Sequence, residues 1–288
     1  MSTRKIAFVT YHRAPNLTPD DALAIAPLKQ FDIEVTPAIW NDPTVNWKQF
    51  DAVIVRSVWD YHRQPRQFRH WLDHLKAQQV TLWNPAAIIR WNMDKKYLRD
   101  LAAKGVTIPP TLWIEAESSA DLFSLLNENR FEQAVIKPII SATAYQTYRT
   151  SPTTARNDQA RLDEILRHSG AMIQKFVDAV TITGEWSLIF FAGRFSHAVL
   201  KRPQAGDFRV QDDFGGTSQS ISPSPELIKQ AGAILRLVEQ PLLYARVDGV
   251  DIDGQFTLIE LELIEPHLFL QMDAVAPQRF AEAILRVL

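Results

Sequence analysis

The first 90 residues alternate between short apolar runs and polar segments that favour helices. The runs KIAFVTY at 5–11, FDIEVTPAIW at 31–40 and DAVIVRS at 51–57 have the length and apolar character of buried strands. A capping residue, a proline and two acids stand at 18–21, which is typical of a helix start, and a further helix is expected from about Pro65 to Gln78. This order predicts a parallel α/β lobe over residues 1–90.

The pattern changes beyond this lobe. A helix is expected at 93–104, and the chain then passes Pro109-Pro110 into mixed strands and helices. From residue 171 onward strands dominate (AMIQKFV, EWSLIFFA, SHAVLK, LYARVDGVDI and FTLIELELI), with helices expected at 224–238 and 277–287 and a Ser/Pro-rich connector at 217–225. The expected fold class is α/β with α+β character: the parallel lobe is followed by two α+β lobes, at 91–176 and 177–288, and the last is an antiparallel sheet with covering helices.

Composition narrows the function classes. The 288 residues are 46% hydrophobic and 22% charged, as in an ordinary globular protein, and the formal net charge is −2. Without a basic excess, nucleic acid is not an expected partner, and without cysteine neither disulfides nor thiolate metal sites are expected. No apolar stretch approaches the roughly 20 residues of a membrane span, so a cytoplasmic location without a membrane partner is expected. No G-x-G-x-x-G follows the first strand, which removes the main support for a dehydrogenase.

Acidic residues are dense on two of the predicted C-terminal strands. Glu260 and Glu262 are two apart and leave one face, and a three-residue loop at 253–255 would pair them with Asp248 and Arg246 respectively. A strict two-residue loop would turn Asp248 to the other face. Hard oxygen ligands of this kind suit Mg²⁺, which takes one or two carboxylates and completes its shell with water and phosphate oxygens. The alternative is a polar strip that faces solvent.

Two lysines form a second signal. Lys95 is expected at the start of a helix, and Lys137 ends the apolar strand AVIK. Both are suited to phosphate oxygens if they face a cleft. The small residues at 138–144, among them Ser141, have backbone amides and hydroxyls that could close over phosphates. The alternative is that the lysines are solvated and the small residues form an ordinary turn.

Two arginines lie in the stretch LKRPQAGDFRVQDDFGG. Arg202 and Arg209 would place positive charge where a γ-phosphoryl group is transferred, and Gly215-Gly216 would let the backbone approach a ligand. A surface loop with incidental charges explains this stretch equally well when it is considered alone.

A polar and aromatic cluster follows the strand AVIV, where ligands of open α/β sheets bind. Arg56 could hold a carboxylate and Asp60 an ammonium, which would suit an amino-acid-like substrate. Trp59 and Tyr61 alternate in the manner of a strand end, so a structural role suits that pair almost as well. The predicted substrate residues are Arg56, Ser57, Trp59, Asp60 and Tyr61, with weaker candidates at 11–13.

The order of these segments resembles the ATP-grasp superfamily of carboxylate-amine ligases over essentially the whole chain. WNMDKKYLRDLAAKGVTIPPT is similar to the family's first lysine region, VIKPIISATA to its second lysine and phosphate loop, and MIQKFV to the hinge that grips adenine. GEWS stands where the ribose-binding acid is expected, LKRPQAGDFRVQDDFGG resembles the arginine loop of ribosomal-protein glutamate ligases, and ARVDGVDIDGQFTLIELELIEP resembles the strand pair with the metal ligands. VRSVWDYHRQPRQF, NPAAIIRWNMDKKYL and ELELIEPHLFL most resemble the subgroup of D-cycloserine ligase and glutathione-synthetase-like proteins.

The resemblance implies a site and a mechanism. ATP would lie between the two later lobes with magnesium, either two Mg²⁺ ions or Mn²⁺ in their place, and the loops 138–144 and 203–216 would close over it. The substrate carboxylate would attack the γ-phosphorus, and an amine would displace phosphate from the acyl phosphate. The implied residues are Lys95, Lys137, Ser141, Gln174, Lys175, Phe176, Val177 and Glu185 for ATP, Asp248, Glu260 and Glu262 for the metal, and Arg202, Arg209 and Arg246 for charge balance during transfer.

Two departures from the family and two other functions stay open. Glu262 stands where many members have Asn, and the loop after Lys137 has no glycine between 138 and 144. A non-catalytic nucleotide-binding module would bind ATP without releasing ADP, and a ligase that extends a protein tail would need a long open groove. The expected partner is a small amino-acid-like molecule, and the chain is expected to be a monomer or a homodimer.

Overall fold

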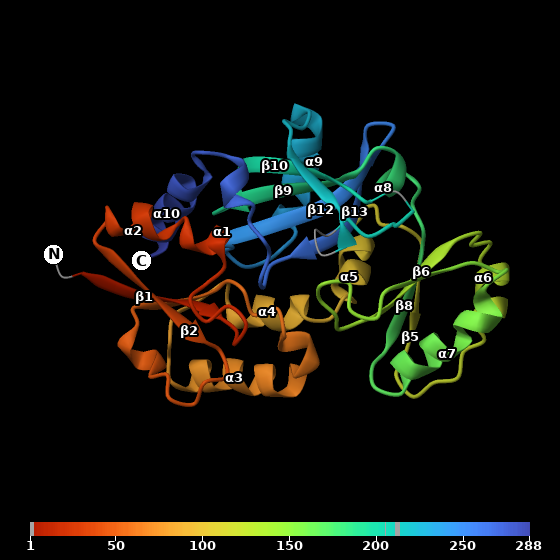
Figure 1. Ribbon diagram of the computed structural model, residues 1–288, viewed down its shortest axis with the longest axis horizontal. Coiled ribbons are helices and arrows are strands. Elements are labelled where there is room, and N and C mark those ends of the chain that lie inside the picture. The colour runs from red at the N-terminus through yellow and green to blue at the C-terminus, as the bar shows by residue number, and fades with distance from the viewer. Residues whose placement is uncertain (1–2, 205, 211–213) are drawn as a thin grey trace.

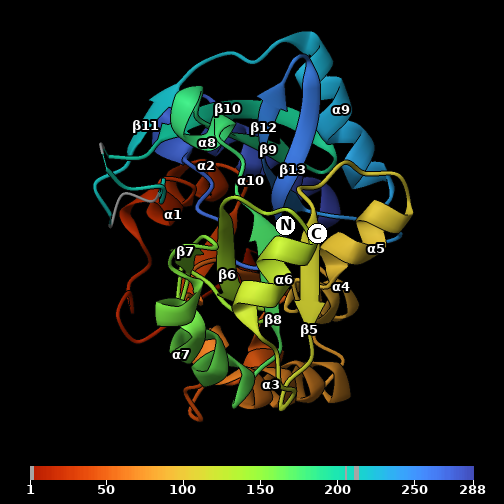
Figure 2. The same ribbon diagram turned by 90° about the vertical axis from the view of Figure 1, so that its right-hand side faces the viewer.

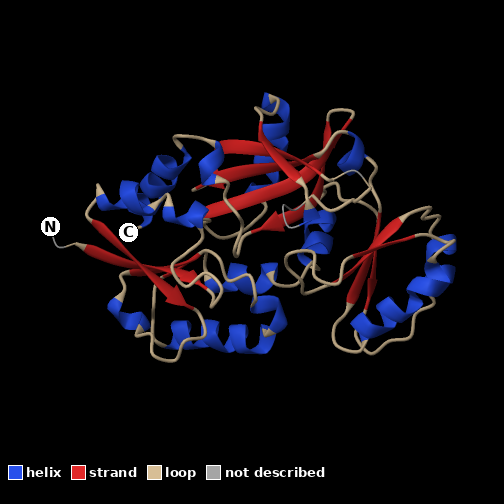
Figure 3. Cartoon of the chain, viewed as in Figure 1, coloured by secondary structure: helices blue, strands red, loops and turns tan. Residues whose placement is uncertain are grey.

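The computed structural model describes residues 3–204, 206–210 and 214–288, whose strands gather into sheets at the left, top and right of Figure 1. Each of the lobe ranges predicted from the sequence contains one of these sheets. Figure 3 separates helices from strands and shows helices on the outer side of the right-hand sheet. None of the helices described combines the length and apolar character that crossing a bilayer requires. The fold is the α/β and α+β combination expected from the sequence.

The N-terminal sheet is parallel, with the order β2-β1-β3-β4. The predicted helix start at 18–21 is confirmed, because Thr18 Oγ1 accepts a hydrogen bond of 3.1 Å from the backbone N–H of Asp21. The elements are β1 Arg4–Thr10, α1 Pro19–Ala22, α2 Ile25–Lys29, β2 Ile33–Ile39, η1 Trp47–Gln49, β3 Ala52–Val55, η2 Tyr61–Arg63, α3 Pro65–Ala77 and β4 Leu82–Trp83.

The central sheet is antiparallel, with the order β5-β8-β6-β7. The helix predicted at 93–104 begins only at Tyr97, because Lys95 donates its backbone N–H to Ile139 O at 2.8 Å and residues 93–96 form a turn. The elements are α4 Ala86–Asn92, α5 Tyr97–Ala103, β5 Thr111–Ile114, α6 Leu122–Glu128, β6 Ala134–Pro138, β7 Tyr148–Thr150, α7 Ala155–Leu166 and β8 Ala171–Lys175. Figure 2 looks onto this lobe.

The C-terminal sheet is antiparallel, with the order β11-β10-β9-β12-β13. The expected connector at 217–225 begins with a strand instead, because 217–220 pairs with the edge of β10. The elements are α8 Ala179–Ile182, β9 Glu185–Phe191, β10 Arg194–Arg202, β11 Thr217–Ser220, α9 Pro225–Arg236, β12 Tyr244–Ile252, β13 Gln255–Glu262, η4 Leu270–Met272 and α10 Ala276–Val287.

The first and last lobes share a hydrophobic core. The Phe280 ring on α10 lies 6.2 Å from the Phe8 ring on β1 and 5.0 Å from the Phe191 ring on β9, measured between centroids. Helix α10 also lies beside α2 (Figure 1). This shared core fixes the N-terminal lobe against the C-terminal sheet.

Helices α4 and α5 pack with the C-terminal sheet rather than with the central one. Leu98 and Leu101 are buried with residues of β9 and β13, and the backbone N–H of Leu261 donates to Tyr97 Oη at 2.9 Å. The boundary expected at residue 90 falls inside α4. We propose that the central lobe begins after α5, near Gly105.

Candidate active site

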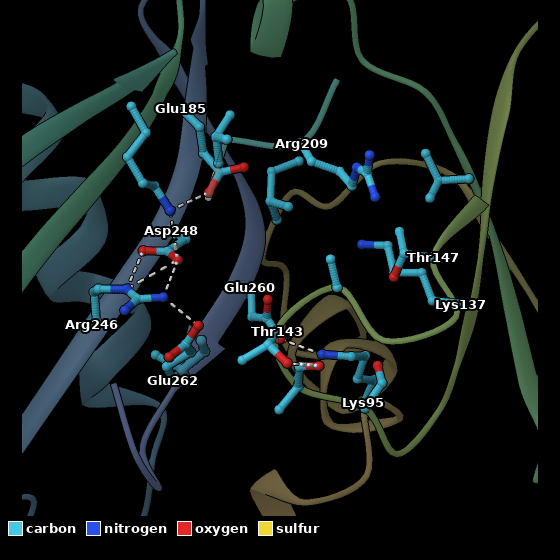
Figure 4. A pocket seen from close by; sticks show the side chains of 18 of the residues that line it. Lys95, Lys137, Thr143, Thr147, Glu185, Arg209, Arg246, Asp248, Glu260 and Glu262 are labelled. Atoms are coloured by element: carbon cyan, nitrogen blue, oxygen red, sulfur yellow. Dashed lines mark hydrogen bonds and ion pairs between the residues drawn. The ribbon is translucent and has the colours of Figure 1, made fainter. Parts of the chain in front are cut away.

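A cavity of about 380 Å³ lies where the three lobes meet. Its walls come from the turn before α5, from β6 and the loop after it, from the end of β8, and from β9, β10, β12 and β13. Figure 4 shows carboxylates of the C-terminal sheet on one side and Lys95 and Lys137 on the other. The predicted nucleotide and metal residues that line the cavity are Lys95, Lys137, Ser141, Gln174, Lys175, Phe176, Val177, Glu185, Asp248, Glu260 and Glu262.

The hairpin of β12 and β13 brings the predicted acids together. Arg246 lies opposite Glu262 and Asp248 lies opposite Glu260, which is the pairing expected from the sequence. All four side chains reach the cavity. One hairpin therefore supplies both the carboxylates and an arginine.

The sequence predicted that a three-residue turn at 253–255 would produce this pairing, and that prediction is wrong. The turn has only two residues, Asp253 and Gly254, both with positive φ (52° and 83°). The register is restored by a β-bulge, because Gly249 pairs with Leu258 and Ile259 is the extra residue of β13. The bulge, not a longer turn, places Asp248 on the cavity face.

Asp248 is 2% exposed and is held by side chains from three strands. It accepts hydrogen bonds from Ser187 Oγ at 2.7 Å, Arg246 Nε at 3.0 Å and Lys201 Nζ at 3.2 Å. Burial by itself raises the pKa of this carboxyl, but Arg246 and Lys201 outweigh burial and hold the pKa at about 2. Asp248 is therefore ionised at neutral pH.

Glu260 and Glu262 each face a protein cation. Lys95 Nζ donates to Glu260 Oε1, and Arg246 Nη2 donates to Glu262 Oε1. Burial raises the pKa of Glu260, but the cations outweigh burial and the pKa falls below its usual value. Burial, opposed by Arg246 and reinforced by Glu260, raises the pKa of Glu262 to about 7. Of these two neighbouring carboxyls, Glu260 is therefore the stronger acid and Glu262 the weaker one.

The acids suit a metal that is held jointly with phosphate. Among the described residues, no three acids or histidines are grouped so that they would hold an ion by themselves. Mg²⁺ takes only one or two carboxylates and completes its shell with water and phosphate oxygens, so such a group is not required. The hard oxygens of Asp248, Glu260 and Glu262 fit that chemistry.

Lys201 is a site residue that the sequence interpretation missed. Its Nζ lies 2.7 Å from Glu185 Oε1 and 3.2 Å from Asp248 Oδ2, and the residue is 5% exposed. Burial lowers the pKa of Lys201, but the two acids outweigh burial and raise it. The available signal was the strand register, in which Lys201 lies directly opposite Glu185.

Arg202 does not line the cavity, and the catalytic role predicted for it has no support in this geometry. Successive side chains of a strand alternate between faces, so Lys201 points inward and Arg202 is exposed. Arg209 does line the cavity; its Nη2 lies 2.7 Å from Asp207 Oδ2, and its guanidinium lies 3.7 Å from the ring centre of Phe214. Of the loop predicted to close at 203–216, residues 205 and 211–213 lie outside the described residues, so that closure stays a prediction.

Lys95 and Lys137 face the acids from the opposite wall. Burial lowers the pKa of Lys95, but Glu260 outweighs burial and the pKa is raised. Lys137 has a weaker partner, since its Nζ lies 3.3 Å from Gln174 Oε1, and burial lowers its pKa. Lys137 is therefore the cation of this wall that has no close carboxylate among the described residues, which suits a group that binds an anionic ligand.

The end of β8 supplies the predicted adenine segment. Gln174 is 4% exposed, and its Nε2 donates to Thr111 Oγ1 at 3.2 Å. Phe176 is packed between the Arg149 guanidinium, 4.2 Å from its ring centre, and the Phe208 ring at 6.2 Å. The end of β8 is thus a half-apolar edge of the cavity, which would suit a flat base.

The loop after β6 adopts left-handed backbone without glycine. Thr143, Ala144 and Gln146 have φ of 52°, 55° and 49°. Ser141 is 7% exposed and donates to Pro138 O at 3.2 Å, while Thr143 and Thr147 point toward the cavity (Figure 4). The loop therefore forms a turn over the cavity although the family's glycines are missing.

Arg56 is buried in a structural network and is not a wall of the cavity. It is 1% exposed; its Nε and Nη2 both lie 2.9 Å from Asp21 Oδ1, and Nη2 also donates to Pro266 O at 2.9 Å. Its guanidinium lies 4.9 Å from the ring centre of Tyr244. These donors are already engaged, so the carboxylate-binding role predicted for Arg56 has no support in its position.

The other predicted substrate residues divide into two groups. Ser57 Oγ donates to Thr10 Oγ1 at 3.0 Å, and Asp60 accepts from Trp40 Nε1 at 2.8 Å; neither lines the cavity. Trp59 and Tyr61 do line it, at the end next to the N-terminal lobe. The aromatic pair, not its polar neighbours, therefore faces the site.

The segment after β13 adds two lining residues that sequence reasoning did not identify, Glu265 and His267. Burial, together with Glu262 and Glu260, raises the pKa of Glu265 well above its usual value. Burial and the Arg246 cation lower the pKa of His267 to about 4, so that imidazole is neutral at pH 7. The motif ELELIEPH carried the signal, since its third acid directly follows the two expected metal ligands.

Comparison with known proteins gives the family. Residues 6–84 match the family described as the N-terminal domain of D-cycloserine synthetase DcsG. The cycloserine biosynthesis protein DcsG of Streptomyces lavendulae is 30% identical over 263 residues, which cover 85% of this chain and 86% of that protein.

Solved structures agree with this result. The crystal structure of D-cycloserine synthetase DcsG is similar with a TM-score of 0.88 and 28% identity, over 98% of this chain and 99% of that one. A D-alanine–D-alanine ligase from Bacillus anthracis, complexed with ATP, has a TM-score of 0.72 at 16% identity, over 98% and 96% of the two chains, and shows the shared fold. The chain belongs to the DcsG family of ATP-grasp carboxylate-amine ligases.

Proposed function

We propose that this ligase uses ATP to close a small ring in an amino-acid-like substrate, by joining the substrate's carboxylate to an amine of the same molecule. The observation that carries the proposal is the cavity in which Lys95 and Lys137 face Asp248, Glu260 and Glu262. The similarity to a D-cycloserine synthetase supports a cyclic amide as the product. A cytoplasmic enzyme that acts as a monomer or homodimer fits this role.

The nucleotide would lie along the wall between the central and C-terminal sheets. The segment 174–177 would contact adenine, and Glu185, at the start of β9, would bind the ribose hydroxyls. Lys95, Lys137 and Ser141 would hold the phosphates, because the buried ammonium of Lys95, the half-buried ammonium of Lys137 and a turn of small residues line the cavity. Phosphate binding would stabilise the Lys137 ammonium most, because no carboxylate of the described residues lies close to it.

Asp248, Glu260 and Glu262 would hold Mg²⁺ together with the phosphates, as two ions, with Mn²⁺ as a substitute. The metal would supply Lewis-acid charge compensation at the phosphate oxygens. Lys95 and Arg246 now occupy Glu260 and Glu262, so they would move toward phosphate oxygens as the carboxylates turn to the metal. The extra carboxylate of Glu262, where many relatives have Asn, would strengthen metal binding.

The chain's own groups account for the transfer steps. The substrate carboxylate oxygen attacks the γ-phosphorus and ADP leaves, which forms an acyl phosphate; the amine nitrogen then attacks the carbonyl carbon, phosphate leaves and the nitrogen loses a proton. Arg246 and Arg209 would neutralise charge on the transferred group. The loop at 138–144 would exclude water that would otherwise hydrolyse the acyl phosphate.

An isotope experiment tests this mechanism. O-amino-D-serine is the preferred probe, because its aminooxy nitrogen closes a five-membered ring on its own carboxylate to give cycloserine. With ¹⁸O in the carboxylate and Mg-ATP present, one ¹⁸O should appear in the released phosphate. ADP release without label in the phosphate would contradict activation as an acyl phosphate.

A further inference from the structure

Within the part of the chain that the structure describes, the side chain of Glu265 differs from the other acids that line the cavity in having no ion-pair partner. Glu185 faces Lys201, Asp248 and Glu262 face Arg246, and Glu260 faces Lys95. Among the described residues, none donates a hydrogen bond to the Glu265 carboxylate or forms an ion pair with it. Burial disfavours a carboxylate without a partner, and burial together with Glu262 and Glu260 raises the pKa of Glu265.

The backbone that carries Glu265 is fixed from several sides. Side chains bind the carbonyls of five successive residues: Tyr244 Oη donates to Ile264 O at 2.8 Å, Trp59 Nε1 to Glu265 O at 3.1 Å, Arg56 Nη2 to Pro266 O at 2.9 Å, and Arg246 Nη1 to His267 O at 3.0 Å, while His197 Nε2 lies 2.9 Å from Leu268 O. These donors come from both the N-terminal and the C-terminal lobe. A carboxylate on so constrained a segment is preorganised, which is the property of a recognition group.

Aromatic side chains stand beside this carboxylate. Trp59 and Tyr61 line the same cavity, and the Trp59 ring is tied to Glu265 by its hydrogen bond to the backbone carbonyl. Tyr61 is 4% exposed, and its pKa is raised by burial first and then by the Glu265 carboxylate. Aromatic faces next to a carboxylate form an environment that an organic ammonium occupies well.

We propose that Glu265, together with Trp59 and Tyr61, binds an ammonium group of the substrate. This ammonium is the one that is not joined to the substrate's carboxylate in the reaction. The acceptor oxygens of Glu265 suit an ammonium rather than a second carboxylate, because an ammonium donates hydrogen bonds and a carboxylate only accepts them. The inference rests on the proposed function, since it assumes an amino-acid-like substrate.

The test is calorimetric binding to the full chain in the presence of Mg-ADP at neutral pH. The ligands are D-cycloserine and isoxazolidin-3-one, which has the same ring without the amino group. The wild type should bind D-cycloserine at least tenfold more tightly, and Glu265→Gln should reduce this preference to less than threefold. Glu128→Gln, on the exposed side of α6, is the matched control and should keep the preference.

Other results of this binding experiment distinguish a failure of the inference from a failure of the proposed function. An unchanged preference in Glu265→Gln would overturn the ammonium role and leave the proposed function in place. Weakened Mn²⁺ binding in that variant, with the preference kept, would make Glu265 a metal ligand and also overturn the inference. If the wild type binds ADP but not D-cycloserine, the proposed substrate class fails and the inference fails with it.

Discussion

The ammonium of Lys201 on β10 lies 2.7 Å from the carboxylate of Glu185 on β9, directly opposite it in the sheet. The same ammonium reaches Asp248 on β12 at 3.2 Å. One buried cation therefore links the acid proposed for the ribose to an acid proposed for the metal.

Lys201→Met should remove activity and destabilise the fold. It leaves Glu185 and Asp248 buried without this cation, and breaking a buried ion pair costs about 3–5 kcal/mol. Arg202→Met is the matched control, because it removes a positive charge one residue away on the exposed face. Chemical denaturation and ADP release should show a large effect for Lys201→Met and a small one for Arg202→Met; equal effects would contradict the assignment.

Gly249→Ala should disturb the bulge that orients Asp248. A β-carbon at Gly249 would lie 2.5 Å from Thr257 O and from the Phe256 ring, so the strands must shift at a cost of about 2 kcal/mol or more. Gly254→Ala in the turn meets no atom within 4 Å and should cost on the order of 1 kcal/mol for its positive φ. Only Gly249→Ala should also weaken metal-dependent activity; full activity in that variant would count against the bulge as the positioning element.

Much of this fold could be predicted from the sequence because its strands and helices are locally consistent. The strand AVIV, the helix from Pro65 and the C-terminal hairpin have clear periodicity and start signals, and the structure has them. The bulge at Gly249 could not be predicted, because it depends on packing across two strands. The turn that holds Lys95 likewise depends on Ile139, which is distant in sequence.

The site was predictable in part for the same reason. The predicted acids of the hairpin and both predicted lysines line the cavity. Arg202 was predicted from its charge and its place in the arginine loop, but it does not line the cavity, whereas its neighbour Lys201 does. Arg56 looked like a substrate ligand because it ends a parallel strand. Its partner Asp21 comes from another segment, and that contact is visible only in three dimensions.

Arg56→Met should destabilise the protein without changing ATP affinity. The substitution leaves Asp21 buried without its ion-pair partner and removes the hydrogen bond to the Pro266 carbonyl. The free energy of unfolding should fall by about 3–5 kcal/mol. Arg66→Met, on the exposed side of α3, should have little effect on unfolding. A large rise in substrate KM with unchanged stability would instead restore the predicted carboxylate role of Arg56.

Asp20 should make the stability fall as the pH rises. Burial raises the pKa of Asp20 to about 6 from 3.8, so the native state keeps a proton that the unfolded state releases near pH 4. Raising the pH from 4 to 7 therefore favours unfolding, by an amount on the order of 2–3 kcal/mol. Denaturation of Asp20→Asn should lack this component, so its stability relative to the wild type should increase over that range; a constant difference would contradict the assignment.

The central claim is that substrate activation consumes ATP in this cavity. The direct measurement is ADP and phosphate release with Mg-ATP across amino acids and amino-acid analogues, O-amino-D-serine included, with Lys137→Ala as the control. At least one compound should release ADP and phosphate in equal amounts in the wild type and at the background rate in Lys137→Ala. If no compound releases ADP above that control, the protein is not the ligase described above.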